Sequence, residues 1–281
     1  MTVELRTGKL KRLARQMFKG RWPLAIAVVL VTALLRTAPP FILTSLSRSE
    51  VVSYIADLYS LLITGPLLLG LANYFISQFR NEEDAGFSRI TDGLGRFWSG
   101  VSLFVVSLVF TMLWSMLFIV PGIIAAIRYS QAFYILADNP GMPAFECIAR
   151  SKQMMQQNKG KYFLLQLSFL PWLILASIPS SYVVVDSMDL SGIFISEKIL
   201  DDLLRAVVIA EAQPLVRILS ILPLFVSAYM YMANACFYDI ASGNLRLEFG
   251  GQVPQTNDPY ARDTYEITGF TQEPAEDQTE R

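Results

Sequence analysis

Four polar side chains interrupt stretches of this sequence that are otherwise apolar, and they are the residues best placed to do chemistry: Arg36, Asp57, Arg128 and Gln131. An ionisable group inside a bilayer costs roughly 2.5–3.5 kcal/mol on insertion scales, so it marks an interhelical tie, a solute path or a headgroup contact. At ~1.5 Å per residue, the three charged residues fall within roughly 10 Å of the outer membrane boundary. Asp57 could therefore pair with either arginine, which would offset most of the insertion cost.

Simpler interpretations compete with a buried site at two of these positions. Arg36 can snorkel outward along its own stem, and Asp57 can lie in an interfacial segment. We favour these interpretations for both residues. Arg128 lies inside a short apolar run and Gln131 follows it by one turn, so we expect Arg128 to be buried, as an interhelical tie or as a contact to an anionic headgroup.

A Pro–Gly step must position Arg128. Two apolar runs meet at Pro121–Gly122, which predicts a hinge between two membrane helices, the second of which lines the protein interior. Small residues before, at and after this step would let helices approach closely. They are Gly65, Gly70, Gly122, Ala125 and Ala126.

The composition indicates an all-α, polytopic membrane protein. The chain is 53% hydrophobic and only 17% charged, with a mean hydropathy of +0.41, whereas an ordinary soluble domain is roughly 25% charged. The apolar residues form blocks long enough for the ~20 residues that a crossing helix needs. We predict a helical bundle over residues 22–240 with six spans, which are 22–46, 51–79, 98–120, 122–138, 162–185 and 214–240.

The N-terminal residues 1–21 are predicted to form a basic amphipathic helix at the membrane interface. They hold seven Lys or Arg residues against one acid, and Leu10, Leu13 and Phe18 recur at helical spacing. Such a segment can fix the N-terminus in the cytoplasm, and it can also lie on anionic lipid headgroups. These interpretations are compatible. The expected partners of the N-terminal helix are the lipid bilayer and its anionic headgroups. Residues 80–97 contain a second amphipathic stretch.

The distribution of Lys and Arg favours both termini in the cytoplasm. Six crossings place most basic residues of the connecting segments on one side of the membrane. The alternative of one long span over residues 98–137 would export the basic residues that follow it, so we reject it. The segments 1–21, 80–97, 138–161 and 241–281 carry 7, 3, 4 and 3 Lys or Arg residues, and the opposite segments 47–50 and 186–217 carry 1 and 3.

The C-terminal residues 241–281 are polar and acidic and include several Pro, Gly, Gln and Thr residues. They lack the apolar content that a folded core requires. We therefore predict a disordered cytoplasmic tail, which offers a binding site for a protein partner.

A pattern that occurs three times suggests an internal repeat. Each even-numbered span contains a proline followed eight residues later by a tyrosine, which three helical hairpins would generate. Because tyrosine is common in this chain, chance is the competing explanation. The pairs are Pro66 with Tyr74, Pro121 with Tyr129, and Pro223 with Tyr231.

Signatures of catalysis and of metal binding are missing from the sequence. The chain has no histidine, which removes the commonest general base and the commonest metal ligand. Cys147 and Cys236 form no CxxC motif, and no GxSxG, HExxH, Walker or Rossmann pattern stands in a supporting context. We expect no enzyme activity, no cofactor, no metal and no nucleic-acid partner.

The stretch VPGIIAAIRYSQAFYILADNP over residues 120–140 resembles a bacterial family of integral membrane proteins known as domain of unknown function nine-seven-five. LKRLARQMFKGRWPLAI, GPLLLGLANYF and YMANACFYDI also look like that family. The stretch is more distantly similar to the membrane domains of some glycerophosphodiester phosphodiesterases, whose catalytic domain has no counterpart here. The resemblance implies a multi-pass helical bundle in a bacterial cytoplasmic membrane and supplies no reaction.

Three functional hypotheses follow. The first is a non-enzymatic protein that handles lipids or envelope precursors, or that assists a membrane complex. The second is a transporter or efflux component for small solutes or peptides, with the charged residues lining a path, and the third is a membrane enzyme. A cavity with Arg128 open to water would favour transport, a groove open to lipid would favour lipid handling, and a sealed bundle would favour a scaffold.

Overall fold

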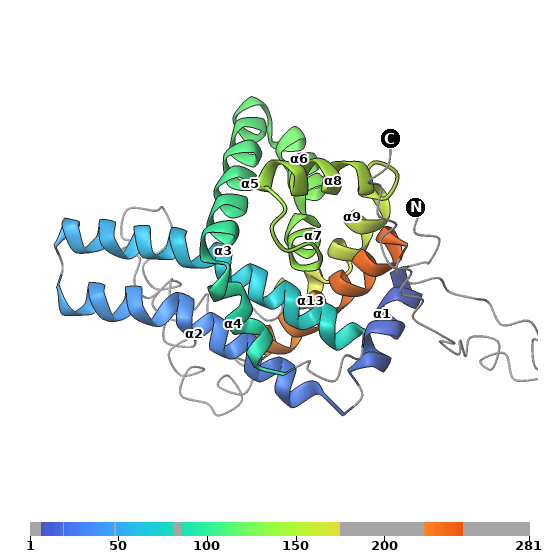
Figure 1. Ribbon diagram of the computed structural model, residues 1–281, viewed down its shortest axis with the longest axis horizontal. Coiled ribbons are helices and arrows are strands. Elements are labelled where there is room, and N and C mark those ends of the chain that lie inside the picture. Colours follow the sequence, from blue (N-terminus) through green and yellow to red (C-terminus); the bar gives the residue numbers. More distant parts are fainter. Residues whose placement is uncertain (1–6, 19, 48, 81–85, 175–221, 244–281) are drawn as a thin grey trace, which may run out of the picture.

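The protein is described from a computed structural model, which covers residues 7–18, 20–47, 49–80, 86–174 and 222–243. Every regular element within these ranges is a helix (Figure 1), which confirms the predicted all-α class. The helices are α1 (Thr7–Met17), α2 (Trp22–Leu46), α3 (Glu50–Phe79), α4 (Ser88–Gly95), α5 (Phe97–Leu117), α6 (Ile119–Tyr129), α7 (Ala132–Asp138), α8 (Ala144–Met154), α9 (Lys159–Leu167) and α13 (Leu222–Ser242).

Four of these segments are long and apolar enough to cross a membrane, which supports a membrane-embedded protein. Two of the six predicted spans reach beyond the described residues: span 162–185 is described only to residue 174 and span 214–240 only from residue 222. The predicted tail at 241–281 also lies almost entirely outside them. Six crossings and the threefold repeat remain predictions. The four segments are Trp22–Leu46, Glu50–Phe79, Phe97–Leu117 and Ile119–Asp138.

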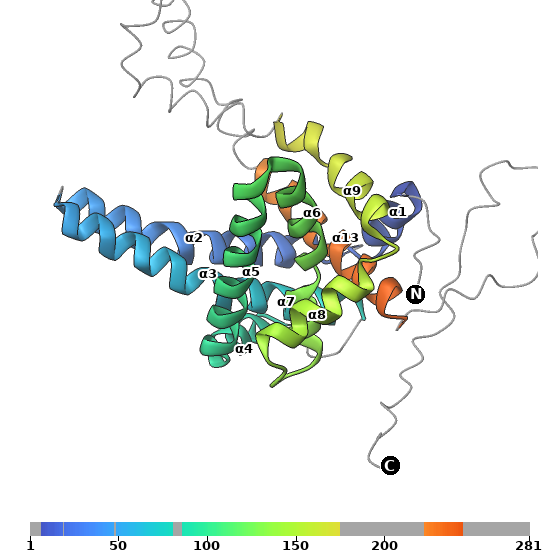
Figure 2. The same ribbon diagram turned by 90° about the horizontal axis from the view of Figure 1, so that it is seen from above.

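Two helical hairpins leave a common base in different directions. The α2–α3 hairpin projects to one side in Figure 1, while α5–α6 rises from the body of the protein, and Figure 2 shows the same divergence from above. Within the first hairpin, the Tyr59 hydroxyl donates to the Leu35 carbonyl over 2.7 Å. Because the two hairpins diverge, their ends lie far apart. The core of the described residues forms at the bases of the hairpins.

The core lies where the second half of α3 meets α7 and α13. From Thr64 onward α3 is almost continuously buried, whereas most of its earlier residues are exposed. The stretch Met232–Ala241 of α13 is buried throughout. Phe75 of α3 stacks on Tyr231 of α13 with ring centroids 5.5 Å apart. These buried halves fix the ends of the helices that carry the candidate site.

Glycine allows the hairpins to approach each other at their crossing point. A Cβ on Gly100 of α5 would lie 2.8 Å from the backbone nitrogen of Pro66 in α3. A Cβ on Gly70 would lie 2.7 Å from the carbonyl oxygen of Ile90 in α4. Backbone atoms cannot yield to such contacts, so the predicted role of small residues in close packing is confirmed for Gly70.

The predicted hinge at Pro121–Gly122 is displaced by three residues. The chain reverses at Phe118, whose backbone is extended at φ −162° and ψ 154°, and Pro121 lies in the first turn of α6. Proline is tolerated there because amide hydrogens of a first helical turn have no partner within the helix. Gly122 packs on Ser115, whose Cα atom would lie 2.9 Å from a Cβ at this position. The glycine therefore brings α5 and α6 together after the turn rather than making it.

Candidate functional site

Helix α1 docks on the protein through its apolar face. Leu10, Ala14 and Phe18 are buried to 1% exposure or less. Phe18 stacks on Trp22 with ring centroids 4.3 Å apart, and the Tyr229 hydroxyl donates to the Lys11 carbonyl over 2.7 Å. The apolar face that predicted an interfacial helix is thus covered by protein, and the basic residues Arg12 and Arg15 remain exposed.

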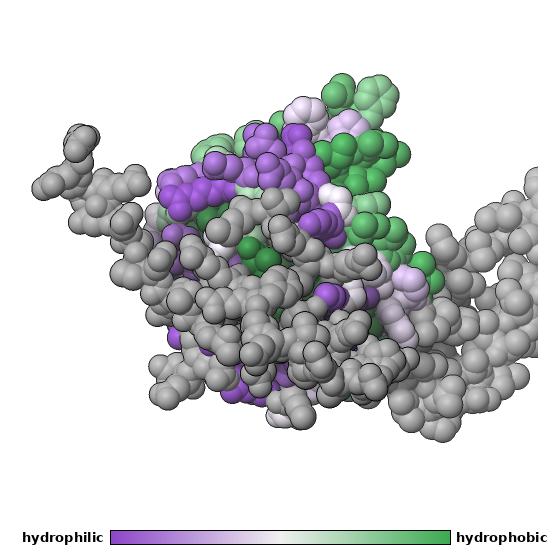
Figure 3. Space-filling model, turned by 90° about the vertical axis from the view of Figure 1, so that its right-hand side faces the viewer, coloured by the Kyte–Doolittle hydropathy of each residue, from purple (hydrophilic) through white to green (hydrophobic). Residues whose placement is uncertain are grey.

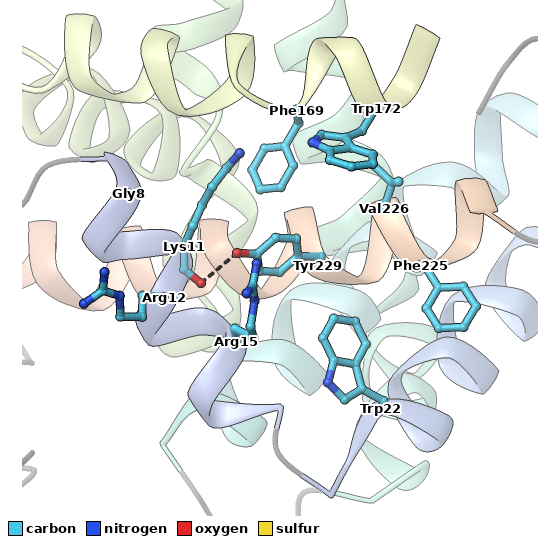
Figure 4. Close-up of a pocket in the computed structure, with 10 residues that line it drawn as sticks. All are labelled: Gly8, Lys11, Arg12, Arg15, Trp22, Phe169, Trp172, Phe225, Val226 and Tyr229. Carbon is cyan, nitrogen blue, oxygen red and sulfur yellow. Dashed lines mark hydrogen bonds between the residues drawn. The ribbon is translucent and has the colours of Figure 1, made fainter. Parts of the chain in front are cut away.

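Under the basic face of α1 lies a cavity of about 480 Å³, which we call the basic–aromatic pocket (Figure 4). Helix α1 supplies its cationic side, α13 and the start of α2 supply one aromatic wall, and residues 169–172 supply another. Its lining residues are Gly8, Lys11, Arg12, Arg15, Trp22, Phe169, Trp172, Phe225, Val226 and Tyr229.

Lys11 reaches across one end of this pocket. Its Nζ atom donates to the Ser168 carbonyl over 3.0 Å and lies 4.2 Å from the centre of the Phe169 ring. Burial lowers the pKa of the Lys11 ammonium, and repulsion by Arg15 lowers it further. Lys11 therefore ties α1 to the segment after α9 and is a cation that an incoming anion would stabilise.

The two arginines face outward at the rim. Arg12 and Arg15 are exposed, and the Arg15 guanidinium lies beside the Tyr229 hydroxyl (Figure 4). The described residues that line the pocket include three cations and no acid, so the electrostatic potential that they create at the mouth favours an anion. Below the rim the lining is aromatic and aliphatic, which suits an apolar group. The pocket is thus complementary to a molecule with an anionic end and an apolar body.

A buried charge network holds α13 against α3 and α7. The Arg80 guanidinium lies 2.6 Å from an Asp138 oxygen and 2.7 Å from an Asp239 oxygen, and the Tyr238 hydroxyl donates to Asp138 over 2.9 Å. Burial opposes the charge on Arg80, but hydrogen bonds to the two carboxylates outweigh it and raise the pKa of Arg80. This network fixes the helix that forms one wall of the pocket.

This network was not predicted from the sequence. Its signal was a charged residue at or next to the end of each predicted even-numbered span, namely Arg80, Asp138 and Asp239. Three such residues at corresponding helix ends can meet only if the helices converge there.

The residues predicted to do chemistry do not gather in one place. Arg36 and Asp57 are exposed, and neither forms an ion pair with any residue that the structure describes. No Asp57–Arg36 or Asp57–Arg128 ion pair therefore forms among the described residues. Arg128 is half-buried, and Gln131 is fully buried. None of the four lines the basic–aromatic pocket.

Arg128 does take part in an interhelical tie, but through its backbone. The Ser151 hydroxyl of α8 donates to the Arg128 carbonyl over 2.7 Å and accepts from the Gln131 amide over 3.2 Å. Ser151 thus bridges the break between α6 and α7, where the helical hydrogen-bond ladder is interrupted. Among the described residues, the Oε1 atom of Gln131 has no hydrogen-bond partner.

The described residues contain no group of three or more His, Cys, Asp or Glu side chains that could hold a metal ion. Cys147 and Cys236 are buried and unpaired. Burial raises the pKa of the Cys147 thiol to about 11, so this thiol is a packing group and not a nucleophile at neutral pH.

Comparison with known proteins gives one family. Residues 116–244 match the family described as "Protein of unknown function (DUF975)". The match includes the central stretch 120–140 and YMANACFYDI, and it supports the resemblance noted in the sequence. No curated protein and no solved structure matches the chain. The family description names no reaction or ligand.

Proposed function

We propose that this chain is a non-enzymatic, multi-pass protein of a bacterial cytoplasmic membrane that binds an anionic lipid or lipid-like envelope precursor in the basic–aromatic pocket. The headgroup would lie against Lys11, Arg12 and Arg15, and the apolar part would lie along Trp22 and Phe225. The observation that carries the proposal is the placement of three cations over an aromatic cavity of about 480 Å³.

The size and chemistry of the cavity support a bound amphiphile. Ligand sites in proteins commonly enclose roughly 300–1,000 Å³ and combine apolar walls with a few placed polar groups. Arginine at the rim can make bidentate, charge-assisted hydrogen bonds to a phosphate. The aromatic residues below it provide large apolar surfaces that stop before the polar headgroup. A soluble phosphate would use only the first of these features.

The surroundings also favour a ligand from the membrane. Trp22, which lines the pocket, is the first residue of a helix apolar enough to cross a bilayer. The basic face of α1 belongs to the N-terminal segment that the distribution of charge places in the cytoplasm. The pocket would then lie at the cytoplasmic headgroup layer, where a lipid enters sideways. A role as an accessory of a membrane complex, through the tail at 241–281, would be compatible with this binding.

Native mass spectrometry can test the proposal. Protein purified from membranes is expected to retain anionic phospholipid, and a variant with Lys11, Arg12 and Arg15 replaced by Gln is expected to retain at least tenfold less. A matched control replaces three cations elsewhere by Gln, namely the exposed Arg150 and Lys152 and the half-buried Arg89, and should retain lipid as the wild type does. Equal retention by both variants would refute the pocket as the binding site.

A further inference from the structure

The geometry points to a re-entrant wedge: the α5–α6 hairpin enters one leaflet of the bilayer, ends near the midplane at Phe118 and returns to the side from which it came. Its partner is the acyl-chain region of that leaflet. The wedge comprises residues 109–128. By length alone both segments could cross a membrane, because α5 has 21 residues and the segment Ile119–Asp138, which joins α6 and α7, has 20.

Helix α8 marks the water boundary on the hairpin. It packs across the middle of α5 and the end of α6: the ring of Phe145 lies 6.2 Å from that of Phe110, and Ser151 binds the Arg128 carbonyl over 2.7 Å. On its other face α8 carries a Glu146–Arg150 ion pair whose side chains are 46% and 52% exposed. Half-exposed paired charges belong in water or among headgroups, so the hydrocarbon begins above the level of Phe110 and Arg128.

The hairpin beyond that level is too short to cross. From Phe110 to the end of α5 at Leu117 the rise is about 11 Å, and from Ile119 to Arg128 it is about 14 Å, at ~1.5 Å per residue. The hydrocarbon core of a bilayer is ~30 Å thick, so one leaflet contributes about 15 Å. If Arg150 and Lys152 snorkelled toward the headgroups, α8 could lie somewhat deeper in the bilayer. The gain in depth would be less than the thickness of the second leaflet, which a crossing hairpin would have to span. The tip therefore reaches the bilayer midplane and not the far headgroups.

The chemistry of the tip agrees with this depth. Met116, Phe118 and Ile119 are 85%, 70% and 78% exposed, and residues 116–127 contain no polar side chain. A crossing hairpin would expose this apolar turn to water on the far side, which soluble surfaces avoid. Figure 3 shows hydrophobic residues at the upper end of the molecule, directly next to a hydrophilic surface.

The α2–α3 hairpin provides the contrast within the same chain. Its turn contains Ser47, Ser49 and Glu50, all exposed, as expected for a connection that emerges into water. A re-entrant α5–α6 hairpin leaves both of its ends on one side, so the side assigned to each terminus is unchanged. The distribution of Lys and Arg could not reveal it, because the turn at residue 118 has no basic residue nearby.

Spin labelling of the full-length protein in phospholipid vesicles tests the wedge. A nitroxide on Phe118→Cys, and separately on Ile119→Cys, reports its depth through the ratio of collisions with oxygen and with a water-soluble nickel complex. Ser49→Cys is the matched control at the turn of the other hairpin. Unmodified protein, with its two buried cysteines, gives the background labelling.

The proposal expects both α5–α6 labels within about 5 Å of the bilayer midplane, with at least a tenfold lower exposure to nickel than the label at residue 49. A nickel exposure at residues 118 and 119 equal to that at residue 49 would overturn it, since the hairpin would then cross. Labels at these positions that are shielded from both reagents would also overturn it, because protein and not lipid would then cover the tip.

Discussion

The Nη2 atom of Arg80 lies 2.7 Å from Oδ1 of Asp239, although 159 residues separate the two along the chain. The same guanidinium binds Asp138, so one cation joins the ends of α3, α7 and α13. The Asp239 side chain is only 2% exposed. A charge buried to this degree is tolerated only with a close and well-oriented partner, which makes this ion network a principal constraint on the pocket wall.

Replacement of Arg80 by Gln is expected to lower the free energy of unfolding by about 3 kcal/mol, the typical cost of breaking a buried ion pair by removing one partner. Thermal unfolding in detergent should show the loss. Arg150→Gln removes the exposed partner of Glu146 and should cost no more than about 0.5 kcal/mol. Equal effects of the two substitutions would show that the Arg80 network contributes no more than a surface pair.

Gly100→Ala tests the crossing of α3 and α5. Alanine has the higher helix propensity by about 1 kcal/mol, yet its Cβ would lie 2.9 Å from the Cα atom of Pro66. We expect destabilisation of about 1–3 kcal/mol, the usual cost of overpacking. Gly160→Ala has nothing within 4 Å of the added Cβ and should be neutral or stabilising. A Gly100→Ala protein as stable as the wild type would contradict the close approach.

Ser151→Ala removes both hydrogen bonds that bridge the α6–α7 break. Because the Arg128 carbonyl and the Gln131 amide would lose a buried partner, the expected loss is about 1–3 kcal/mol in the free energy of unfolding. The exposed Ser102 hydroxyl bonds only to the Ser99 carbonyl in its own helix, so Ser102→Ala is the control and should change stability by less than about 0.5 kcal/mol. Thermal unfolding measures both.

Lipid affinity is expected to depend on pH through Lys11. Its pKa in the free protein lies below the ordinary value of 10.5 because burial and Arg15 disfavour the charged form. A bound anion favours that form, so affinity should fall as the pH rises through the lowered pKa. In Lys11→Arg the guanidinium remains charged, and affinity should stay constant over that range. A fall of equal size in both proteins would assign the pH dependence to another group.

The sequence predicted the helices well, for a local reason. Blocks of about 20 apolar residues can satisfy their backbone groups in lipid only as helices, so positions such as Trp22–Leu46 follow from composition. The turn was missed by three residues because Pro121 and Gly122 are ordinary turn formers, and the actual reversal at Phe118 has no turn residue. After the turn α5 and α6 are held together by packing of Gly122 on Ser115, which no local pattern reveals.

The site was harder to predict because its parts are distant in sequence. The apolar face of residues 1–21 predicted a helix at the membrane interface, but the pattern is the same whether lipid or protein covers that face. The pocket combines Lys11, Phe169 and Phe225, which lie on three separate elements. Arg80 was visible only as a charge at a helix end. Neither the ion network nor the pocket can be derived from the spacing of residues along the chain, because both depend on how α3, α7 and α13 converge in space.

The most direct test of the account is to map where an anionic lipid binds. Phosphatidic acid with a diazirine close to its glycerol end, incorporated into vesicles with the full-length protein, is irradiated, and the labelled peptides are identified. We predict labelling at Trp22, at residues 169–172 and around Phe225, with a loss of at least fivefold in the Arg12→Glu, Arg15→Glu double variant. Labelling confined to the exposed faces of the hairpins, or unchanged in that variant, would contradict binding in the basic–aromatic pocket.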